Sequence, residues 1–345
     1  MKRTLLALSL VIVFCVAWKA LSRIQLTVLG QPESTGAYQQ RSEAPFFENL
    51  ALTTGLPIEV DYRPLNRTGV KDIFQLALLK QGAFDVVSLR FIQNSKTEPT
   101  LEGIDLPIPG LNQIHAKALS DVYFSVIDRR LQEHQRVKLL GLWTFGAQEL
   151  FCSRPVHSLS DLQGLKIRIA GPQLERYFTA LGATAAIIPF DETREALKKK
   201  LIDCAVTSAA SANWARWLDF TSHYIPLSFG FGINGYVIAL DKWNQFTSAE
   251  QKVLSAAFAK QIQSAWLFAK DIYEDSVRCI TGASGCQEGP QRQMKQVNFS
   301  QEDIATMKRI ARSSSIDDWL ENCSKVYGDC KKEWLETIGS VLELN

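Results

Sequence analysis

The segment Gly164-Leu-Lys-Ile-Arg-Ile-Ala-Gly-Pro172 passes from a strand pattern directly into the start of a helix. Ile167 and Ile169 alternate with Lys166 and Arg168, which is the period of two expected for a strand with two unlike faces. The glycine and proline that close the segment end the strand and suit the first turn of a helix. A strand followed at once by a helix is the unit of an α/β fold.

The same alternation continues on both sides of this segment. Apolar runs predict strands near residues 24–28, 58–62, 85–89, 137–143, 150–153, 185–188 and 204–208. Helical patterns lie between them, including a stripe over residues 70–78 and helix starts after Pro172 and Asp191. Strands that alternate with helices predict mainly parallel sheets that are covered on both faces.

An unusually long helix is predicted after Thr247. Thr247-x-x-Glu250 is a capping box, and apolar side chains then recur every four residues from Leu254 to Trp266. The pattern continues to about Arg278. A helix of this length could brace two domains, and two shorter helices joined by a kink are the alternative.

Length and charge narrow the class of protein. A chain of 345 residues with 46% hydrophobic residues is long enough for two domains of ordinary size. The formal net charge is +2, so the chain has no electrostatic footprint for nucleic acid as its main partner.

The N-terminus has the layout of a secretory signal peptide. Two basic residues precede an almost wholly apolar run over residues 5–16, and Ala20-Leu21-Ser22 suits a cut before Arg23. We therefore expect residues 1–22 to be removed and the mature protein to be periplasmic. An uncleaved membrane anchor is the alternative, but the apolar run is short for a span.

Six cysteines lie outside the predicted signal peptide. Two pairs are each seven residues apart: Cys279 with Cys286, and Cys323 with Cys330. Short loops between paired cysteines favour disulfides in an oxidising compartment. Cys152 and Cys204 lie in apolar strand patterns and are expected to be buried thiols. Six free thiols are the alternative, and no cysteine or histidine spacing predicts a metal site.

Arg168 is the first candidate for a ligand contact. It lies near the carboxyl end of its strand, where ligands bind in open α/β sheets, and its guanidinium matches a carboxylate with two parallel donors. A solvated strand face or a structural ion pair is the alternative. Trp143 and Phe145, at the end of another strand, are candidates for a pocket wall or for ordinary core. No enzyme motif or cofactor motif is present, so neither an enzymatic activity nor a cofactor is predicted.

Several motifs, taken in order and spacing, resemble the solute-binding proteins of TRAP transporters, the DctP family. They are Ser160–Gly171, Leu181–Thr184, Pro189–Phe190, Glu195–Leu197 and Asp203–Thr207. The similarity runs from about residue 26 to 275 and is weaker beyond. The closest sub-branch has Asp-Cys-Ala-Val-Thr, as at residues 203–207, and Leu-Leu-Gly-Leu-Trp, as at 139–143.

The resemblance implies a two-lobed periplasmic fold, type II-like, with a ligand cleft between the lobes and a long helix that spans both. Lobe I would comprise residues 23–145 plus 233–272, and lobe II residues 146–232 plus 273–322. The remaining segments would be the signal peptide over residues 1–22 and a C-terminal helical segment over residues 323–345.

The resemblance also implies a function. The chain would be the extracytoplasmic subunit that captures a small organic acid and delivers it to the membrane permease of a TRAP transporter. A ligand-presenting accessory to a signalling receptor is one alternative, and a secreted α/β enzyme is another.

Four site residues follow from the resemblance. Arg168 matches the family arginine that pairs with the substrate carboxylate, and Phe190 matches a pocket aromatic. Gln148 stands where sialic-acid-type members carry a second arginine, and Thr207 stands where they carry an asparagine. A second cation is therefore expected to be missing, which puts sialic acid in doubt and leaves a C4-dicarboxylate open.

Overall fold

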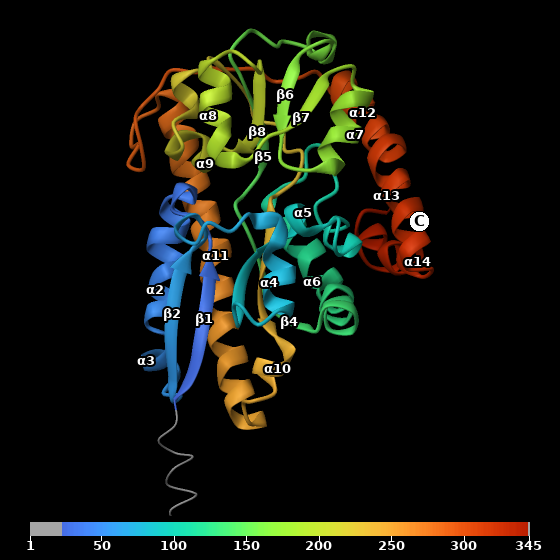
Figure 1. Ribbon diagram of the computed structural model, residues 1–345. Helices are drawn as coiled ribbons and strands as arrows, with labels where there is room; N and C mark the ends of the chain where they lie inside the picture. The colour runs from blue at the N-terminus through green and yellow to red at the C-terminus, as the bar shows by residue number, and fades with distance from the viewer. Residues whose placement is uncertain (1–22, 344–345) are drawn as a thin grey trace, which may run out of the picture.

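The computed structural model describes residues 23–343, so the predicted signal peptide lies outside the described residues. Two separate β-sheets divide the molecule into two halves, one above the other in Figure 1. We call the half built on the first sheet lobe I and the other half lobe II. The predicted two-lobed α/β fold is confirmed.

Lobe I contains a five-stranded sheet in the order β2-β1-β3-β10-β4. The first three of these strands are parallel, whereas β10 runs antiparallel to both of its neighbours. The strands are β1 (Ile24–Gly30), β2 (Ile58–Pro64), β3 (Val86–Arg90), β4 (Val137–Thr144) and β10 (Ile233–Ala239). The sequence prediction contained no strand at β10.

Lobe II contains a six-stranded sheet in the order β11-β9-β5-β8-β6-β7. Here β6, β7 and β8 are parallel, and β5 runs antiparallel to β8 and β9. The strands are β5 (Gln148–Cys152), β6 (Lys166–Ile169), β7 (Thr184–Ile187), β8 (Cys204–Ser208), β9 (His223–Ile225) and β11 (Lys295–Gln296). Each sheet is thus mixed, because each contains a strand that enters from the other lobe.

Helices cover both faces of the sheets, as the apolar strand patterns predict. In lobe I, Val87 packs in one cluster with Tyr123, and Val86 packs on the opposite face with Phe258. The helices are α2 (Ala44–Glu48), α3 (Leu50–Thr54), α4 (Gln75–Lys80), α5 (Phe91–Asn94), α6 (Gln113–Arg130), α7 (Pro172–Ala180), α8 (Phe190–Lys198), α9 (Ala209–Trp214), α10 (Leu240–Trp243), α11 (Ser248–Thr281), α12 (Gln301–Ala311), α13 (Asp317–Val326) and α14 (Cys330–Trp334).

The long helix predicted after Thr247 is confirmed as a single element, α11, of 34 residues. Its capping box forms as predicted, with the Thr247 hydroxyl accepting from the Glu250 N–H. Phe258 packs in lobe I, and Ile280 near the other end packs in lobe II against Tyr224. The helix therefore spans both lobes (Figure 1).

The chain also crosses between the lobes at two extended segments, residues 145–147 after β4 and residues 226–232 after β9. We call these the crossing segments. They lie side by side, because the Phe145 N–H donates to the Gly232 carbonyl at 3.3 Å. Just beyond the first segment, the Gln148 N–H donates to the Gly230 carbonyl at 2.8 Å.

The C-terminal segment returns from lobe II to lobe I. Met307 of α12 lies in the lobe II core, whereas Trp319 of α13 and Trp334 of α14 lie in the lobe I core. The indole N–H groups of both tryptophans donate to lobe I carbonyls, those of Pro99 and Gly103. Packing on lobe I thus begins before residue 323.

All six cysteines within residues 23–343 are paired. The predicted disulfides are confirmed between Cys279 and Cys286 and between Cys323 and Cys330. The prediction of buried thiols at Cys152 and Cys204 is wrong, because these two residues form a third disulfide. They lie directly opposite each other on antiparallel strands β5 and β8, which brings their Cα atoms within 4.1 Å.

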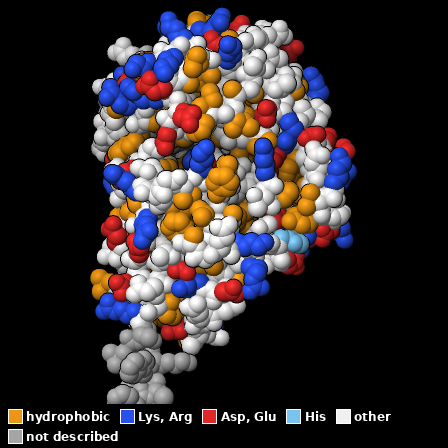
Figure 2. Space-filling model, viewed as in Figure 1, with side chains coloured by type: hydrophobic (Ala, Val, Ile, Leu, Met, Phe, Trp, Pro, Cys, Tyr) orange, Lys and Arg blue, Asp and Glu red, His pale blue; other side chains and the backbone are white. Residues whose placement is uncertain are grey.

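The surface carries no candidate for a membrane-spanning element among the described helices. Figure 2 shows Lys and Arg side chains at the outer end of lobe II. The run Lys198–Lys200, at the end of α8 and just beyond it, is exposed. These side chains are solvated, as charged residues at a helix end commonly are.

Candidate ligand-binding site

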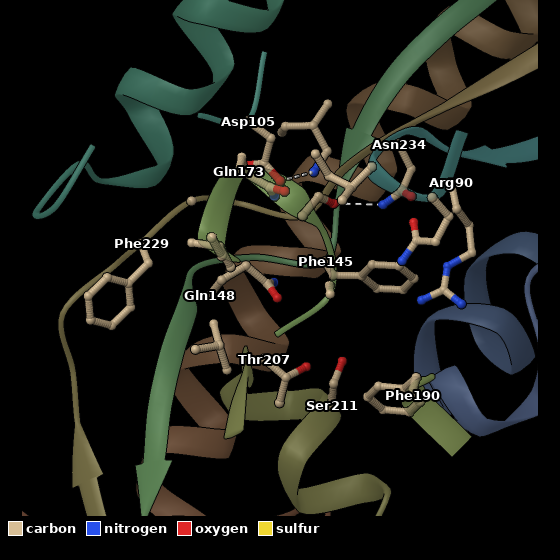
Figure 3. A pocket seen from close by; sticks show the side chains of 18 of the residues that line it. Arg90, Asp105, Phe145, Gln148, Gln173, Phe190, Thr207, Ser211, Phe229 and Asn234 are labelled. Atoms are coloured by element: carbon tan, nitrogen blue, oxygen red, sulfur yellow. Dashed lines mark hydrogen bonds between the residues drawn. The ribbon is translucent and has the colours of Figure 1, made fainter. Parts of the chain in front are cut away.

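A cavity opens between the lobes, where the carboxyl ends of β3, β6 and β8 meet. Its lining includes Arg90 from β3, Arg168 from β6 and Thr207 from β8, together with both crossing segments. The cavity encloses about 690 Å³, its open mouth included. Figure 3 shows aromatic and amide side chains around this space. It lies where open α/β sheets bind ligands.

Arg168 is buried beneath the cavity surface, with 3% of the residue exposed. Its Nε donates to the Ile188 carbonyl and its Nη1 to the Val206 carbonyl, both at 2.9 Å. The guanidinium also lies over the rings of Trp217 and Phe190, at 5.1 and 6.0 Å from their centres. The side chain is thus held in one orientation by groups that carry no negative charge.

The charge of Arg168 has no counterion within residues 23–343, because no Asp or Glu there forms an ion pair with it. Burial lowers the pKa of this guanidinium to about 9, and nearby Arg90 acts in the same direction. The group is still protonated at neutral pH. A buried, unpaired cation at a cavity wall is a site prepared for an anion.

Four other predicted residues reach the same cavity. Gln148, Thr207, Phe190 and Phe145 all contribute to its lining, and Figure 3 shows them around one space. Phe145 comes from the first crossing segment, whereas Gln148, Thr207 and Phe190 come from lobe II, with Gln148 as the first residue of β5. They provide neutral hydrogen-bonding groups and aromatic walls.

Trp143 lies elsewhere. It is fully buried in lobe I and stacks on Tyr38, with ring centres 4.0 Å apart. Phe145 and Tyr236 also pack against it, Phe145 edge-on. Of the two aromatics proposed for a pocket wall, only Phe145 lines the cavity.

A second cation does line the cavity, which corrects the expectation that it is missing. Arg90, the last residue of β3, forms an ion pair with Asp72 at 3.0 Å. It comes from lobe I, whereas the expected position at Gln148 lies on β5. The rule that singled out Arg168, a cation at the carboxyl end of a strand, also describes Arg90.

Asp105 is a lining residue that sequence reasoning missed. Its carboxylate accepts from the Phe231 N–H at 2.6 Å and from the Ile233 N–H at 3.4 Å. Burial raises the pKa of this carboxyl to about 6 against these hydrogen bonds. Asp105 therefore ties lobe I to the second crossing segment, a role with no local sequence signal.

The lobes touch each other around the cavity, so the structure shows a closed form. The side chain of Ile92, from lobe I, lies directly over Gly171 in lobe II, where a Cβ would come within 1.9 Å of it. Ion pairs also join the lobes, between Arg176 and Glu102 and between Arg41 and Glu288. The carboxyl of Glu102 is buried, and burial raises its pKa.

The lining is suited to holding an anion in place. The Arg168 guanidinium provides unpaired charge, amides and hydroxyls provide neutral hydrogen bonds, and Phe145, Phe190 and Phe229 provide apolar surface. The described residues of the lining include no histidine or cysteine. No cluster of three or more metal-ligating side chains exists within residues 23–343.

The family of this chain follows from comparison with known sequences. The family model DctP, described as bacterial extracellular solute-binding protein, family 7, matches residues 39–314. The chain belongs to the DctP family. The suspected relationship to TRAP-transporter solute-binding proteins is thereby confirmed.

Individual relatives of this DctP-family protein are distant in sequence. The sialic acid-binding periplasmic protein SiaP of Vibrio cholerae is 21% identical over 235 residues, which cover 67% of this chain and 73% of the relative. Among solved structures, DctP7 of Bordetella pertussis, a receptor binding pyroglutamic acid, has a TM-score of 0.79 at 16% identity. A TRAP periplasmic solute-binding protein from Desulfovibrio salexigens, with bound orotic acid, has a TM-score of 0.79 at 14% identity. The alignments cover 91% and 92% of this chain and 99% and 100% of those chains.

Proposed function

We propose that this DctP-family protein is the extracytoplasmic solute receptor of a TRAP transporter, that its ligand is a small organic acid, and that it delivers this ligand to a membrane permease. The observation that carries the proposal is Arg168, a buried guanidinium without a counterion at the wall of a cavity between two lobes. Relatives with the same fold bind small acids, namely pyroglutamic and orotic acid.

The proposed binding residues divide by role. Arg168 receives the ligand carboxylate, Gln148 and Thr207 provide neutral hydrogen bonds, and Phe190 and Phe145 enclose the rest of the ligand. A carboxylate that enters a closed cleft loses its hydration, and a guanidinium with neighbouring donors compensates for that loss. The lining offers ligand-binding groups from both lobes, which agrees with a solute receptor.

A thermal-shift screen of organic acids tests the binding part of this proposal. A ligand present at 100 times its Kd stabilises the native state by about 2.7 kcal/mol, a shift that is easily measured. We expect carboxylates to stabilise the protein and their neutral amides or alcohols to have no effect. Stabilisation by neutral sugars alone, with no response to any acid, would contradict the proposal.

The delivery part requires the permease. Proteoliposomes that contain the cognate permease should accumulate the acid only when the receptor and an ion gradient are both present. Equal uptake without the receptor would contradict delivery, while leaving ligand binding unaffected.

A further inference from the structure

The cavity contains two arginines, but only one of them has a charge partner. Arg90 lies on the lobe I side and is paired with Asp72, whereas Arg168 lies on the lobe II side and is unpaired within residues 23–343. The two are close enough for Arg90 to lower the pKa of Arg168 and for Asp72 to oppose that effect. Asp72 therefore competes with a ligand for contact with Arg90.

The Arg90–Asp72 pair is held in place by its surroundings. The Arg90 side chain is 12% exposed and the Asp72 side chain 26% exposed, so the pair is partly shielded from solvent. The Arg90 N–H donates to Gln75 Oε1 at 2.9 Å. The Asn94 amide donates to the carbonyl oxygens of both Asp72 and Arg90, at 3.0 and 2.9 Å. One asparagine thus fixes the backbones that carry both charges.

The remaining charge on the lining is negative. Asp105 is the only carboxylate among the described residues that line the cavity, and it accepts from the Phe231 and Ile233 N–H groups. As an anion, Asp105 cannot pair with the carboxylate of a ligand. Arg168 is the one cation of the described lining whose charge is not already balanced by a carboxylate.

We infer that Asp72 sets the charge selectivity of this cleft: by neutralising Arg90, it makes the cleft select monocarboxylates over dicarboxylates. This inference rests on the proposed organic-acid function and narrows it. A ligand with one carboxylate pairs with Arg168 and places its neutral part among Gln148, Asn234 and the phenylalanines. The second carboxylate of a dianion would have to compete with Asp72 for Arg90 or lose its hydration without a cation, and both are unfavourable.

The test uses pairs of ligands that differ by one charge. Succinate is compared with succinamate, glutarate with glutaramate, and phthalate with phthalamate, because each half-amide keeps the shape of its diacid. Thermal shifts select the pairs that bind, and calorimetric titration gives their Kd values. For wild type, we expect each half-amide that binds to do so more tightly than its diacid.

Asp72→Asn frees Arg90 and should therefore strengthen diacid binding. The ratio of the diacid Kd to the half-amide Kd should fall about tenfold, equivalent to about 1.4 kcal/mol. Asp72→Ala removes the same charge with a side chain of different shape, and its Kd ratio should match that of Asp72→Asn. Asp61→Asn is the matched control, because Asp61 is also a lobe I carboxylate paired with an arginine, Arg63, but on the exposed strand β2. The control should leave the ratio unchanged.

The outcomes distinguish a failure of the inference about Asp72 from a failure of the proposed organic-acid binding. If wild type binds diacids more tightly than half-amides, or if both Asp72 variants keep the wild-type ratio, the inference is wrong although the protein binds organic acids. If no mono- or dicarboxylate binds at all, the proposed function fails and the inference fails with it.

Discussion

Gly171 is a residue at which the two lobes approach each other closely. Its backbone is extended, with a φ of −169°, so any residue could adopt its conformation. A glycine is required there because Ile92 of lobe I occupies the space of a Cβ, at 1.9 Å. The clash with Ile92 exists only when the lobes are closed, whereas the end of the Gln173 side chain in lobe II, which a Cβ would approach to 2.9 Å, is flexible and can move.

Gly171→Ala should weaken ligand binding while leaving the ligand-free protein as stable as wild type. Overpacking a tight contact costs about 1–3 kcal/mol, which corresponds to a roughly 5- to 150-fold higher Kd. Calorimetric titration and thermal melting measure the two effects. Gly328→Ala is the control, since nothing lies within 4 Å of a Cβ there. Equal affinity of Gly171→Ala and wild type would show that Ile92 does not need this space.

Single residues differed in how far the sequence could predict them. Arg168 was predictable because strand alternation and its motif both indicated a cleft position, and the structure places it there. Arg90 was missed although it occupies the same position at the end of a strand, and its pairing with Asp72, 18 residues earlier, has no local signal. Trp143 and Phe145 have the same local signal, yet Trp143 is buried in the lobe I core and Phe145 lines the cavity, a difference that arises from tertiary packing.

At the scale of elements, the disulfide between Cys152 and Cys204 joins strands β5 and β8. It closes a loop of 52 residues, whereas Cys279–Cys286 closes a loop of 7. Chain entropy then predicts about 4 kcal/mol of stabilisation for the long loop and about 2 kcal/mol for the short one. Cys152→Ala with Cys204→Ala should therefore lower the free energy of unfolding more than Cys279→Ser with Cys286→Ser.

Two measurements check this prediction. Non-reducing peptide mapping of the purified protein should link Cys152 to Cys204, and urea unfolding should rank the two double variants as stated. Labelling of Cys152 and Cys204 by a thiol reagent in the unfolded, unreduced protein would contradict the bond.

Glu149 couples three elements where the lobes meet. It lies on β5 and accepts from the Tyr224 hydroxyl of β9 at 2.7 Å and from the Tyr273 hydroxyl of α11 at 2.9 Å. Burial raises the pKa of this carboxyl to about 7, although both hydrogen bonds act to lower it. The folded protein therefore holds this proton at a pH where the unfolded chain has released it.

The pH dependence of stability follows from that difference. The contribution of Glu149 is fully present below the ordinary pKa of 4.5 and is lost as the pH rises through about 7. Between pH 8 and pH 5, wild type should gain free energy of unfolding relative to Glu149→Gln, which has no such proton to bind. Urea unfolding of both proteins at the two pH values measures the gain, and identical pH profiles would rule it out.

Elements were predictable where their pattern was local. The strands β1 to β8 were expected from apolar runs, and α11 from its capping box and its spacing of four. β10 was missed because Asn234-Gly235 resembles a turn, yet Gly235 lies within the strand and leaves room for Phe91, which a Cβ would approach to 2.8 Å. Cys152 and Cys204 could not be paired from sequence, because strand register brings them together.

At the scale of the whole molecule, connections between the lobes determine how they can move. The crossing segments, α11 and the C-terminal segment all pass from one lobe to the other. The C-terminal connection is anchored on both sides, because the Ser315 hydroxyl donates to the Gln173 carbonyl in lobe II and Trp319 packs in lobe I. We expect a bending motion about these connections rather than separation of the lobes.

A ligand that contacts both lobes should favour the closed form, since it gains contacts only there. Small-angle scattering should give a smaller radius of gyration with ligand than without it, and the ligand-bound curve should match the closed structure. Gly171→Ala should need a higher ligand concentration than wild type to reach the smaller radius. A wild-type radius that is unchanged at saturation would contradict closure.

The central claim is that Arg168 receives the ligand carboxylate, and calorimetric titration of Arg168→Ala tests it most directly. Removing one partner of a buried ion pair costs about 3–5 kcal/mol, a loss of hundreds-fold or more in affinity. Arg168→Lys should recover little, because an ammonium lacks the two parallel donors. Gln148→Ala should cost only about 0.5–1.5 kcal/mol, as a neutral hydrogen bond does.

The control is Arg154→Ala, which removes an exposed arginine from the same lobe and should bind as wild type does. The acid used is the one that gives the largest thermal shift, and circular dichroism confirms that each variant is folded. The account predicts a loss of at least about a hundredfold in affinity for Arg168→Ala and no loss for the control Arg154→Ala. A folded Arg168→Ala protein that binds the acid within about threefold of wild type would contradict it.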